Sequence, residues 1–540
     1  MGVTAHIPGS NRKLVFLLLI ALIAIASAYS LLTAAGPSQG FGDDIAYAWS
    51  AHYAAQGAFQ QNTGDIFTVR LLQILPIGFF YWAFGAGQYS SAAWDMASFI
   101  GTLIIVFYLG KELYNEYAGL IAAVLFAFMP TVLQLSGTMS DNPPMMFFAA
   151  LAMLALLYGL NRKSRKWYLI SGIAMVSSFL VTPEGLFIWV VMALYVIARF
   201  VRRGFKFDKN EHYLLYGAIL VAAVLAAYSY ATVQNPLITF SFTFNFFQTN
   251  SYSYSTQIIN AYPMFYIDTM FPYNVLSTLY ANLSRGNFDI PGILAQMYFV
   301  ANNAGLYFYF AVLAAAFLLI RREKSSYFVL FWFIAGFLVM ELDPYHISLS
   351  PFSYILQHRL DRYLTFIAPP AAVIIAIAAV RIVERSKGKA SHYMRIVAVA
   401  AALVFLVGTA IPIDMYWHSV QWYETYNQLQ IANYLNALPN NTRIYYNTGQ
   451  TIPIYMGFRN QSRFMAYDQL DNCSQLQPNS YIGLPVYSKV YNTEYTPAQL
   501  ACAGWRPVLL PVLQNASADV SAFGNAAMTQ LYYIPANGVS

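Results

Sequence analysis

Residues 41–49 read FGDDIAYAW, and they follow an apolar segment that runs from Leu14 to about Thr33. That segment is long enough to cross a bilayer. The adjacent carboxylates of Asp43 and Asp44 therefore lie at the edge of a membrane, where acidic side chains are costly unless they are solvated or functional. Taken alone, the pair fits either a solvated loop or a reactive site, and the rest of the chain bears on the choice.

The composition indicates a helical membrane protein. Of the 540 residues, 58% are hydrophobic and 10% are charged, and the mean hydropathy is +0.48, which excludes an ordinary soluble globular protein. Apolar runs of about 16–25 residues recur from Leu14 to Ile413 and then stop. We therefore predict a polytopic α-helical membrane domain over residues 1–414 and a soluble α/β domain over residues 415–540.

The C-terminal domain contains both cysteines, Cys473 and Cys502. A disulfide between them would close a loop of about 30 residues and add roughly 3 kcal/mol, whereas two unpaired buried thiols are the alternative. Four of five Asn-x-Ser/Thr sequons lie in the same domain, which agrees with an outward-facing position. The sequons are at Asn282, Asn440, Asn460, Asn472 and Asn515.

The positions of the basic residues predict the topology. Eleven spans are expected, at about 14–33, 92–110, 118–137, 144–160, 167–183, 185–201, 213–232, 296–320, 326–341, 363–381 and 394–413. If residues 66–84 form a helix in the outer interface and do not cross, 20 of the 29 Lys and Arg residues share one side. The positive-inside rule makes that side cytoplasmic, so the N-terminus is inside and the C-terminal domain is extracytoplasmic. Basic residues confined to short clusters between apolar runs do not indicate nucleic-acid binding.

Carboxylates and arginines gather on the predicted outer face, in external loops at about 36–91 and 233–295 and at the mouths of the spans. The helix expected after Asp43 ends at Gly57. Asp141, in SGTMSDNPPMMFF (136–148), is either a site residue or an N-cap. Glu184, in LVTPEGLFIW (180–189), is either a site residue or a turn residue.

Residues 356–370, LQHRLDRYLTFIAPP, place His358, Arg359 and Arg362 at the mouth of an apolar span. Arginine suits anionic phosphate because its donors form a fork, whereas interfacial snorkelling or a surface pair between Arg362 and Asp361 are the alternatives. Twelve aromatic residues between 240 and 273 form an interfacial belt or, alternatively, contact a sugar or a lipid tail.

The order of these elements resembles the GT-C superfamily of membrane glycosyltransferases, with protein O-mannosyltransferases and lipid A aminoarabinose transferases as the most similar branches. Members carry an acidic pair, usually Asp-Glu, followed closely by Tyr; here it is Asp43-Asp44 with Tyr47. RLLQILPIGFFYWAFG (70–85) resembles their juxtamembrane helix without its opening prolines. YLGKELYNEYAG (108–119), Pro130 with Asp141, RYLTFIAPP (362–370) and ANYLNALPNNTRIYYNTG (432–449) match later elements.

The resemblance implies transfer of a sugar from a polyprenyl-phosphate carrier, such as dolichyl phosphate, to a protein, lipid or glycan acceptor on the outer membrane face. It implies inversion at the anomeric carbon, with Asp43 as general base, Asp44 in support and Asp141 orienting the acceptor or the base. Arg362, Arg359 and Arg70 are the phosphate candidates, with His358 behind them. The substrate-contacting residues expected from these motifs also include Tyr47 and Glu184. No cofactor is firmly implied, and a divalent metal stays open.

Two other classes remain. An oligosaccharyltransferase-type catalytic subunit would use a divalent metal and a WWDYG-type motif, of which QWYETY (421–426) is the nearest match. A transporter or flippase would place ionisable residues near the bilayer midplane and often shows repeated halves. The chain has no evident repeat, and its acidic residues gather on the outer face, which favours an enzyme over a transporter. A non-catalytic structural or glycan-binding membrane protein is a further alternative, which a transfer assay with Asp43→Asn would distinguish.

Overall fold

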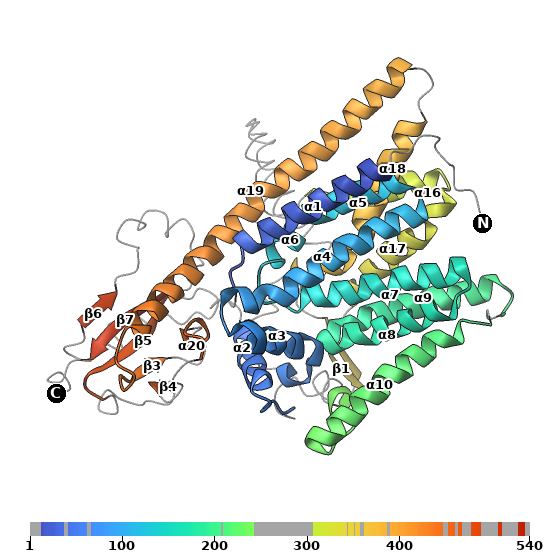
Figure 1. Cartoon of the computed structure of the whole chain (residues 1–540). Helices are drawn as coiled ribbons and strands as arrows, with labels where there is room; N and C mark the ends of the chain where they lie inside the picture. Colours follow the sequence, from blue (N-terminus) through green and yellow to red (C-terminus); the bar gives the residue numbers. More distant parts are fainter. Residues whose placement is uncertain are drawn as a thin grey trace.

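The computed structural model describes residues 12–36, 42–61, 66–206, 209–241, 306–342, 344–349, 352–356, 361–385, 389–446, 452–458, 463–466, 477–487, 506–509 and 528–534. These residues form a helical bundle joined by one long helix to a small sheet (Figure 1). The first half of the bundle comprises α1 (Arg12–Leu32), α2 (Gly42–Ala55), η1 (Ile66–Val69), α3 (Leu71–Phe84), α4 (Gln88–Leu113), α5 (Glu116–Ala127), α6 (Pro130–Leu135), α7 (Asn142–Arg162) and α8 (Arg165–Val181). The second half comprises η2 (Pro183–Gly185), α9 (Leu186–Arg202), α10 (His212–Val233), α16 (Tyr307–Ile320), η4 (Lys324–Ser326), α17 (Tyr327–Glu341), η5 (Asp361–Ile367), α18 (Ala368–Glu384) and α19 (Lys389–Asn436).

Eight helical segments among the described residues are long and apolar enough to cross a membrane. They are Arg12–Leu32, Gln88–Leu113, Asn142–Arg162, Pro183–Arg202, His212–Val233, Lys324–Glu341, Leu364–Glu384 and Ala390–Ile411. α7 and α18 are the most buried of them, while α10 and α19 expose most of their apolar side chains. This arrangement suits a bundle surrounded by lipid, and the count of eleven spans stays a prediction.

The span expected at 118–137 is not one helix. α5 ends at Ala127, and α6 begins at Pro130. Proline has no N–H and disfavours helical geometry at the residue before it, and Met129 is accordingly extended, with φ −72° and ψ 124°. The prediction of a continuous helix was therefore wrong. The break brings the chain into the loop that carries Asp141.

Glycine allows α8 and α10 to pack closely. A β-carbon built on Gly172 would lie 1.9 Å from the backbone oxygen of Leu214, and one on Gly217 would lie 2.2 Å from that of Leu169. Small residues are typical of such crossings in membranes, because the helices gain contact by approaching closely. The close packing fixes α8, whose C-terminal end leads into η2 and Glu184.

α2 and α3 pack against each other at the end of the bundle nearer the sheet (Figure 1). Their shared core contains Tyr47, Ala48 and Ala51 from α2 with Ile74 and Ile77 from α3. The prediction that the first of these helices ends at Gly57 is confirmed within two residues, and the glycine has φ +70°, a left-handed conformation that favours glycine. Residues 66–84 form η1 and the 14-residue α3, and their place in the outer interface stays a prediction.

α19 spans 48 residues, or about 72 Å, which exceeds the ~30 Å hydrocarbon core of a bilayer. It runs through the boundary expected at residue 414 and reaches the sheet (Figure 1), so a separation of two domains there stays a prediction. The sheet has the order β4-β3-β5-β7-β6, with parallel pairs β3–β4 and β3–β5 and antiparallel pairs β5–β7 and β6–β7. Its strands are β3 (Ile444–Tyr446), β4 (Phe464–Ala466), β5 (Ser480–Tyr487), β6 (Arg506–Leu509) and β7 (Met528–Ile534), with α20 (Ile452–Tyr455) alongside.

A hairpin of β1 (Pro344–Leu349) and β2 (Phe352–Leu356) precedes η5, and the sequence patterns did not predict it. Cys473 and Cys502 lie outside the described residues, and so do the sequons at Asn282, Asn460, Asn472 and Asn515. The fifth sequon, at Asn440, lies in an exposed turn after α19.

Candidate active site

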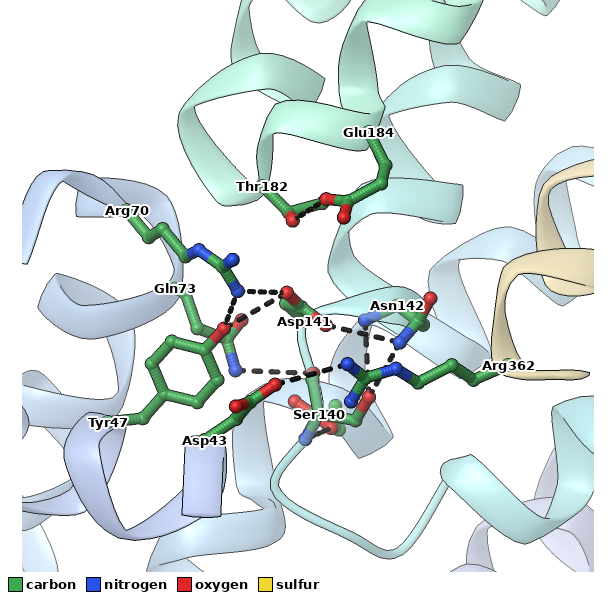
Figure 2. Close-up of polar contacts among 11 residues, drawn as sticks. Asp43, Tyr47, Arg70, Gln73, Ser140, Asp141, Asn142, Thr182, Glu184 and Arg362 are labelled. Carbon is green, nitrogen blue, oxygen red and sulfur yellow. Dashed lines mark hydrogen bonds and ion pairs between the residues drawn. The ribbon is translucent and has the colours of Figure 1, made fainter. Parts of the chain in front are cut away.

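Five segments that are distant in sequence meet beside the first turn of α2 (Figure 2). They are the start of α2, the η1–α3 junction, the loop between α6 and α7, the turn η2, and η5. Each contributes a charged side chain: Asp43, Arg70, Asp141, Glu184 and Arg362, respectively. The predicted convergence of carboxylates and arginines is therefore present among the described residues, and its position on the outer face stays a prediction.

Asp43 pairs with Arg362 across 319 residues of sequence. Arg362 Nη2 donates to Asp43 Oδ2 over 3.1 Å. The Arg362 side chain is 23% exposed and the Asp43 side chain is 31% exposed, so a ligand can reach both charges. Arg362 therefore points to Asp43, which argues against simple interfacial snorkelling.

Arg70, Tyr47 and Asp141 form a buried triad next to that pair. Arg70 Nη1 lies 2.5 Å from Asp141 Oδ2 and also donates to the hydroxyl oxygen of Tyr47. The Tyr47 hydroxyl in turn donates to Asp141 Oδ2 over 3.0 Å. The Arg70 guanidinium also lies over the rings of Tyr47 and Phe67, at 5.6 and 5.3 Å from their centroids.

Electrostatics keep Arg70 charged and Tyr47 neutral. Burial raises the pKa of Tyr47 well above its ordinary value, although Arg70 opposes the shift, so the phenol keeps the proton that it donates. Burial lowers the pKa of Arg70, but the oxygens of Tyr47 and Asp141, with a contribution from Glu184, outweigh that effect and raise it. Within the triad, the positive charge of Arg70 and the negative charge of Asp141 thus compensate each other away from solvent.

Asp141 occupies the N-cap position of α7, but its side chain makes no capping hydrogen bond. Its carboxylate is directed to Arg70 and Tyr47 instead. The N-cap interpretation was therefore wrong for this side chain. The prolines that open α7 reduce the need for a cap, because Pro143 and Pro144 carry no backbone N–H.

The two members of the acidic pair have different environments. Asp43 is half-buried beside Arg362, whereas Asp44 is 6% exposed. The negative charge of Asp44 acts on the carboxyl group of Asp95 in α4. The neighbouring residues thus face different sides of α2, and Asp43 is the more accessible.

Glu184 lies in η2, so the turn interpretation describes its local structure. Its carboxylate accepts a hydrogen bond from the Thr182 hydroxyl (Figure 2). Its negative charge also contributes to the raised pKa of Arg70, which places it electrostatically within the site.

Sequence reasoning missed the residues that hold the loop before α7. Asp95 Oδ2 accepts the backbone N–H of Ser140 over 2.5 Å, and Gln73 Nε2 donates to the carbonyl oxygen of the same residue over 3.2 Å. Asn142 Nδ2 donates to Ser140 Oγ over 3.0 Å and to Asp141 Oδ1 over 3.1 Å. Asp95 interrupts an apolar run within α4, and an acidic residue in a span is a signal that could have found it.

His358 and Arg359 lie outside the described residues. Within the part of the chain that the structure describes, no three His, Cys, Asp or Glu side chains are grouped so as to hold a metal ion.

Comparisons with known proteins give a family match over part of the chain and a shared fold. A family model described as dolichyl-phosphate-mannose-protein mannosyltransferase matches residues 76–230. No curated protein sequence matches the chain. The structure of ArnT from Cupriavidus metallidurans in the apo state has a TM-score of 0.55 at 13% identity, covering 96% of this chain and 98% of that one.

Two further structures share the fold. ArnT from the same organism bound to undecaprenyl phosphate has a TM-score of 0.53 at 12% identity and covers 95% of this chain and 97% of that one. The apo oligosaccharyltransferase of Archaeoglobus fulgidus has a TM-score of 0.51 at 14% identity and covers 87% of this chain and 69% of that one. At such identities the structures are evidence of fold alone. The chain thus has the fold of these membrane proteins, and residues 76–230 match the mannosyltransferase family model.

Proposed function

We propose that the protein transfers a sugar from a polyprenyl-phosphate carrier to a hydroxyl acceptor at the extracytoplasmic face of a membrane. The matching family model is described by a dolichyl-phosphate donor, and ArnT, which shares the fold, has been seen with undecaprenyl phosphate. The distribution of Lys and Arg supports a cytoplasmic N-terminus and an outer-face site. The acceptor belongs to a protein, a lipid or a glycan.

The observation that carries the proposal is the accessible pair of Asp43 and Arg362, 3.1 Å apart. A hydroxyl acceptor needs a base within reach of its proton, and a departing phosphate needs a cation to stabilise its growing charge. The two groups are adjacent here and partly open, whereas Arg70 is occupied by Asp141 in a buried pair. Arg362 is therefore the preferred phosphate ligand among the described arginines.

Donor binding would also activate the base. The donor phosphate competes with Asp43 for the forked guanidinium of Arg362, because arginine binds phosphate through two parallel donors. Asp43, released from the ion pair, takes the proton of the acceptor hydroxyl as its oxygen attacks the anomeric carbon. The bond from that carbon to the phosphate oxygen breaks, and its electron pair stays on the phosphate.

The proposed geometry has the acceptor and the phosphate on opposite faces of the sugar, so the configuration inverts. In this scheme Asp141 orients the acceptor side of the site, while Arg70 and Tyr47 fix the position of its carboxylate. Asp44 supports the start of α2 from its buried position. Arg359 and His358 remain candidates for further phosphate contacts.

An oligosaccharyltransferase-type reaction is the second candidate, because the A. fulgidus enzyme shares the fold over 87% of this chain. The chain covers 69% of that enzyme but 98% of ArnT, which favours the monosaccharide transfer. A loss of transfer on chelation of divalent metals would favour the oligosaccharyltransferase reaction instead.

The test uses the purified protein in liposomes with polyprenyl-phosphate-linked sugars and candidate acceptors. Asp43→Asn should lower turnover by about 10²–10⁴-fold, the usual contribution of a general base, while donor binding persists. Glu112→Gln, at the far end of α4, is the matched control and should keep wild-type turnover. Unchanged turnover in Asp43→Asn would remove the base assignment, and a wild type that neither transfers nor hydrolyses any such donor would refute the proposed reaction.

A further inference from the structure

Ser140 is held at both of its backbone hydrogen-bonding groups by buried side chains from two different helices. Its N–H donates to Asp95 Oδ2 of α4 over 2.5 Å, and its carbonyl oxygen accepts from Gln73 Nε2 of α3 over 3.2 Å. Asp95 and Gln73 are both fully buried. The N–H belongs to the peptide unit before Ser140 and the carbonyl to the unit after it, so the two hydrogen bonds restrict the backbone on both sides of its α-carbon.

The held residue immediately precedes Asp141, so its position sets where the Asp141 carboxylate lies. Arg70 is the N-cap residue of α3, and Gln73 lies in the first turn of the same helix. The start of α3 therefore contacts the loop twice, through Gln73 at the Ser140 carbonyl and through Arg70 at the Asp141 side chain. Figure 2 shows Gln73 and Arg70 reaching the loop from the same side.

The arrangement is costly for a purely structural contact. Asp95 Oδ1 and Gln73 Oε1 are buried and have no hydrogen-bond partner among the described residues. An acidic side chain within a membrane span is rare unless it serves the function of the protein. Buried polar atoms left unsatisfied in a native structure are likewise uncommon.

We infer that Asp95 and Gln73 are positioning residues that clamp the backbone at Ser140 and thereby hold Asp141, and through it Arg70 and Tyr47, beside the base Asp43. The role of the clamp in catalysis rests on the proposed function, whereas the clamp itself does not. Both side chains are fully buried, so their loss should reduce the rate of the chemical step and leave donor affinity nearly unchanged. A displacement of about 1 Å at a catalytic group costs on the order of 10²-fold in rate.

The experiment compares Asp95→Leu, Asp95→Asn and Gln73→Met in the full-length protein. Asp95→Leu and Gln73→Met should each lower kcat by about 10- to 100-fold with the donor KM changed less than about twofold. Asp95→Asn keeps an oxygen that accepts the Ser140 N–H, so it should retain most of the activity. Ser98→Ala, a fully buried position one turn further along α4, is the control and should behave as wild type.

Amide hydrogen exchange of the segment 138–142 provides a readout that does not depend on sugar transfer. Exchange at Ser140 should accelerate in Asp95→Leu and stay slow in Asp95→Asn, at unchanged thermal stability of the rest of the protein. If exchange is unaffected in both Asp95→Leu and Gln73→Met, or if Asp95→Asn is as impaired as Asp95→Leu, the clamp is refuted. Accelerated exchange in a protein that transfers no sugar would support the clamp and overturn the proposed function alone.

Discussion

The buried pair of Arg70 and Asp141 predicts a strong energetic coupling. The two side chains are 10% and 8% exposed, and their nearest charged atoms are 2.5 Å apart. Removing one partner of a buried pair leaves an uncompensated charge and typically costs about 3–5 kcal/mol. Arg70→Met and Asp141→Asn should therefore each destabilise the protein by about that amount.

The double variant should be much less destabilised than the sum of the single variants, because it leaves no buried charge unpaired. We expect a coupling energy of about 3 kcal/mol, at the upper end of the range for residues in direct contact. Unfolding of the protein in detergent micelles, followed by tryptophan fluorescence, measures all four members of the cycle. The reference cycle is Arg162→Met with Glu112→Gln, a partly exposed pair 3.6 Å apart, for which a coupling energy of about 0.2–1 kcal/mol is expected.

Additive effects of the two buried substitutions would refute this reasoning. A coupling below about 0.5 kcal/mol, within the range of independent sites, would mean that Arg70 and Asp141 are not a pair in the folded protein. The same outcome would remove the reason for assigning Arg70 to positioning and would return it to the phosphate candidates.

Three further predictions concern other parts of the molecule. Arg362→Gln should raise the donor KM and lower kcat, and a purely structural role would leave the donor KM unchanged in a protein of unaltered stability. Gly172→Ala should lower the free energy of unfolding by about 1–3 kcal/mol, because the new methyl group clashes with the Leu214 carbonyl oxygen. Gly408→Ala, with open space around it, should be neutral or stabilise the protein by up to about 1 kcal/mol. Equal shifts of the melting temperature in the two variants would contradict the packing argument. Burial lowers the pKa of His52 below its usual 6.5, so its contribution to stability is present above pH ~6.5 and declines as the pH falls. Between pH 7.5 and 5 the free energy of unfolding should therefore decline less in His52→Gln than in the wild type. Parallel curves for the two proteins would refute this.

Local chemistry explains what could be predicted along the chain. A run of apolar residues long enough for a bilayer is a local property, and so is the end of α2 at Gly57, which adopts φ +70°. The prediction that Asp43, Asp141, Arg70 and Arg362 gather at one face followed from counting basic residues on either side of the spans. The resemblance to GT-C enzymes added roles to those residues, and the family match over residues 76–230 and the fold shared with ArnT agree with that resemblance.

Errors arose where tertiary contacts compete with local patterns. Asp141 stands where an N-cap is expected, but the cap is not formed, because a buried guanidinium offers its carboxylate a stronger partner. The segment 118–137 is apolar enough for one span, yet Pro130 divides it. Asp95 was overlooked because the span interiors were taken as nearly free of charge, and its purpose depends on a loop 45 residues away.

The sequence by itself indicated that this chain enters a membrane repeatedly and which superfamily it resembles, because hydropathy and short motifs are written in consecutive residues. The outward position of its acidic pair stays a prediction from the charge bias. Only the tertiary structure decided that Asp43 meets Arg362 while Asp44 is buried, and that Asp141 pairs with Arg70. Adjacent side chains on a helix point in different directions, and their partners come from segments tens to hundreds of residues away. The pairing of charges therefore depends on how the helices pack, which no local pattern in the chain specifies.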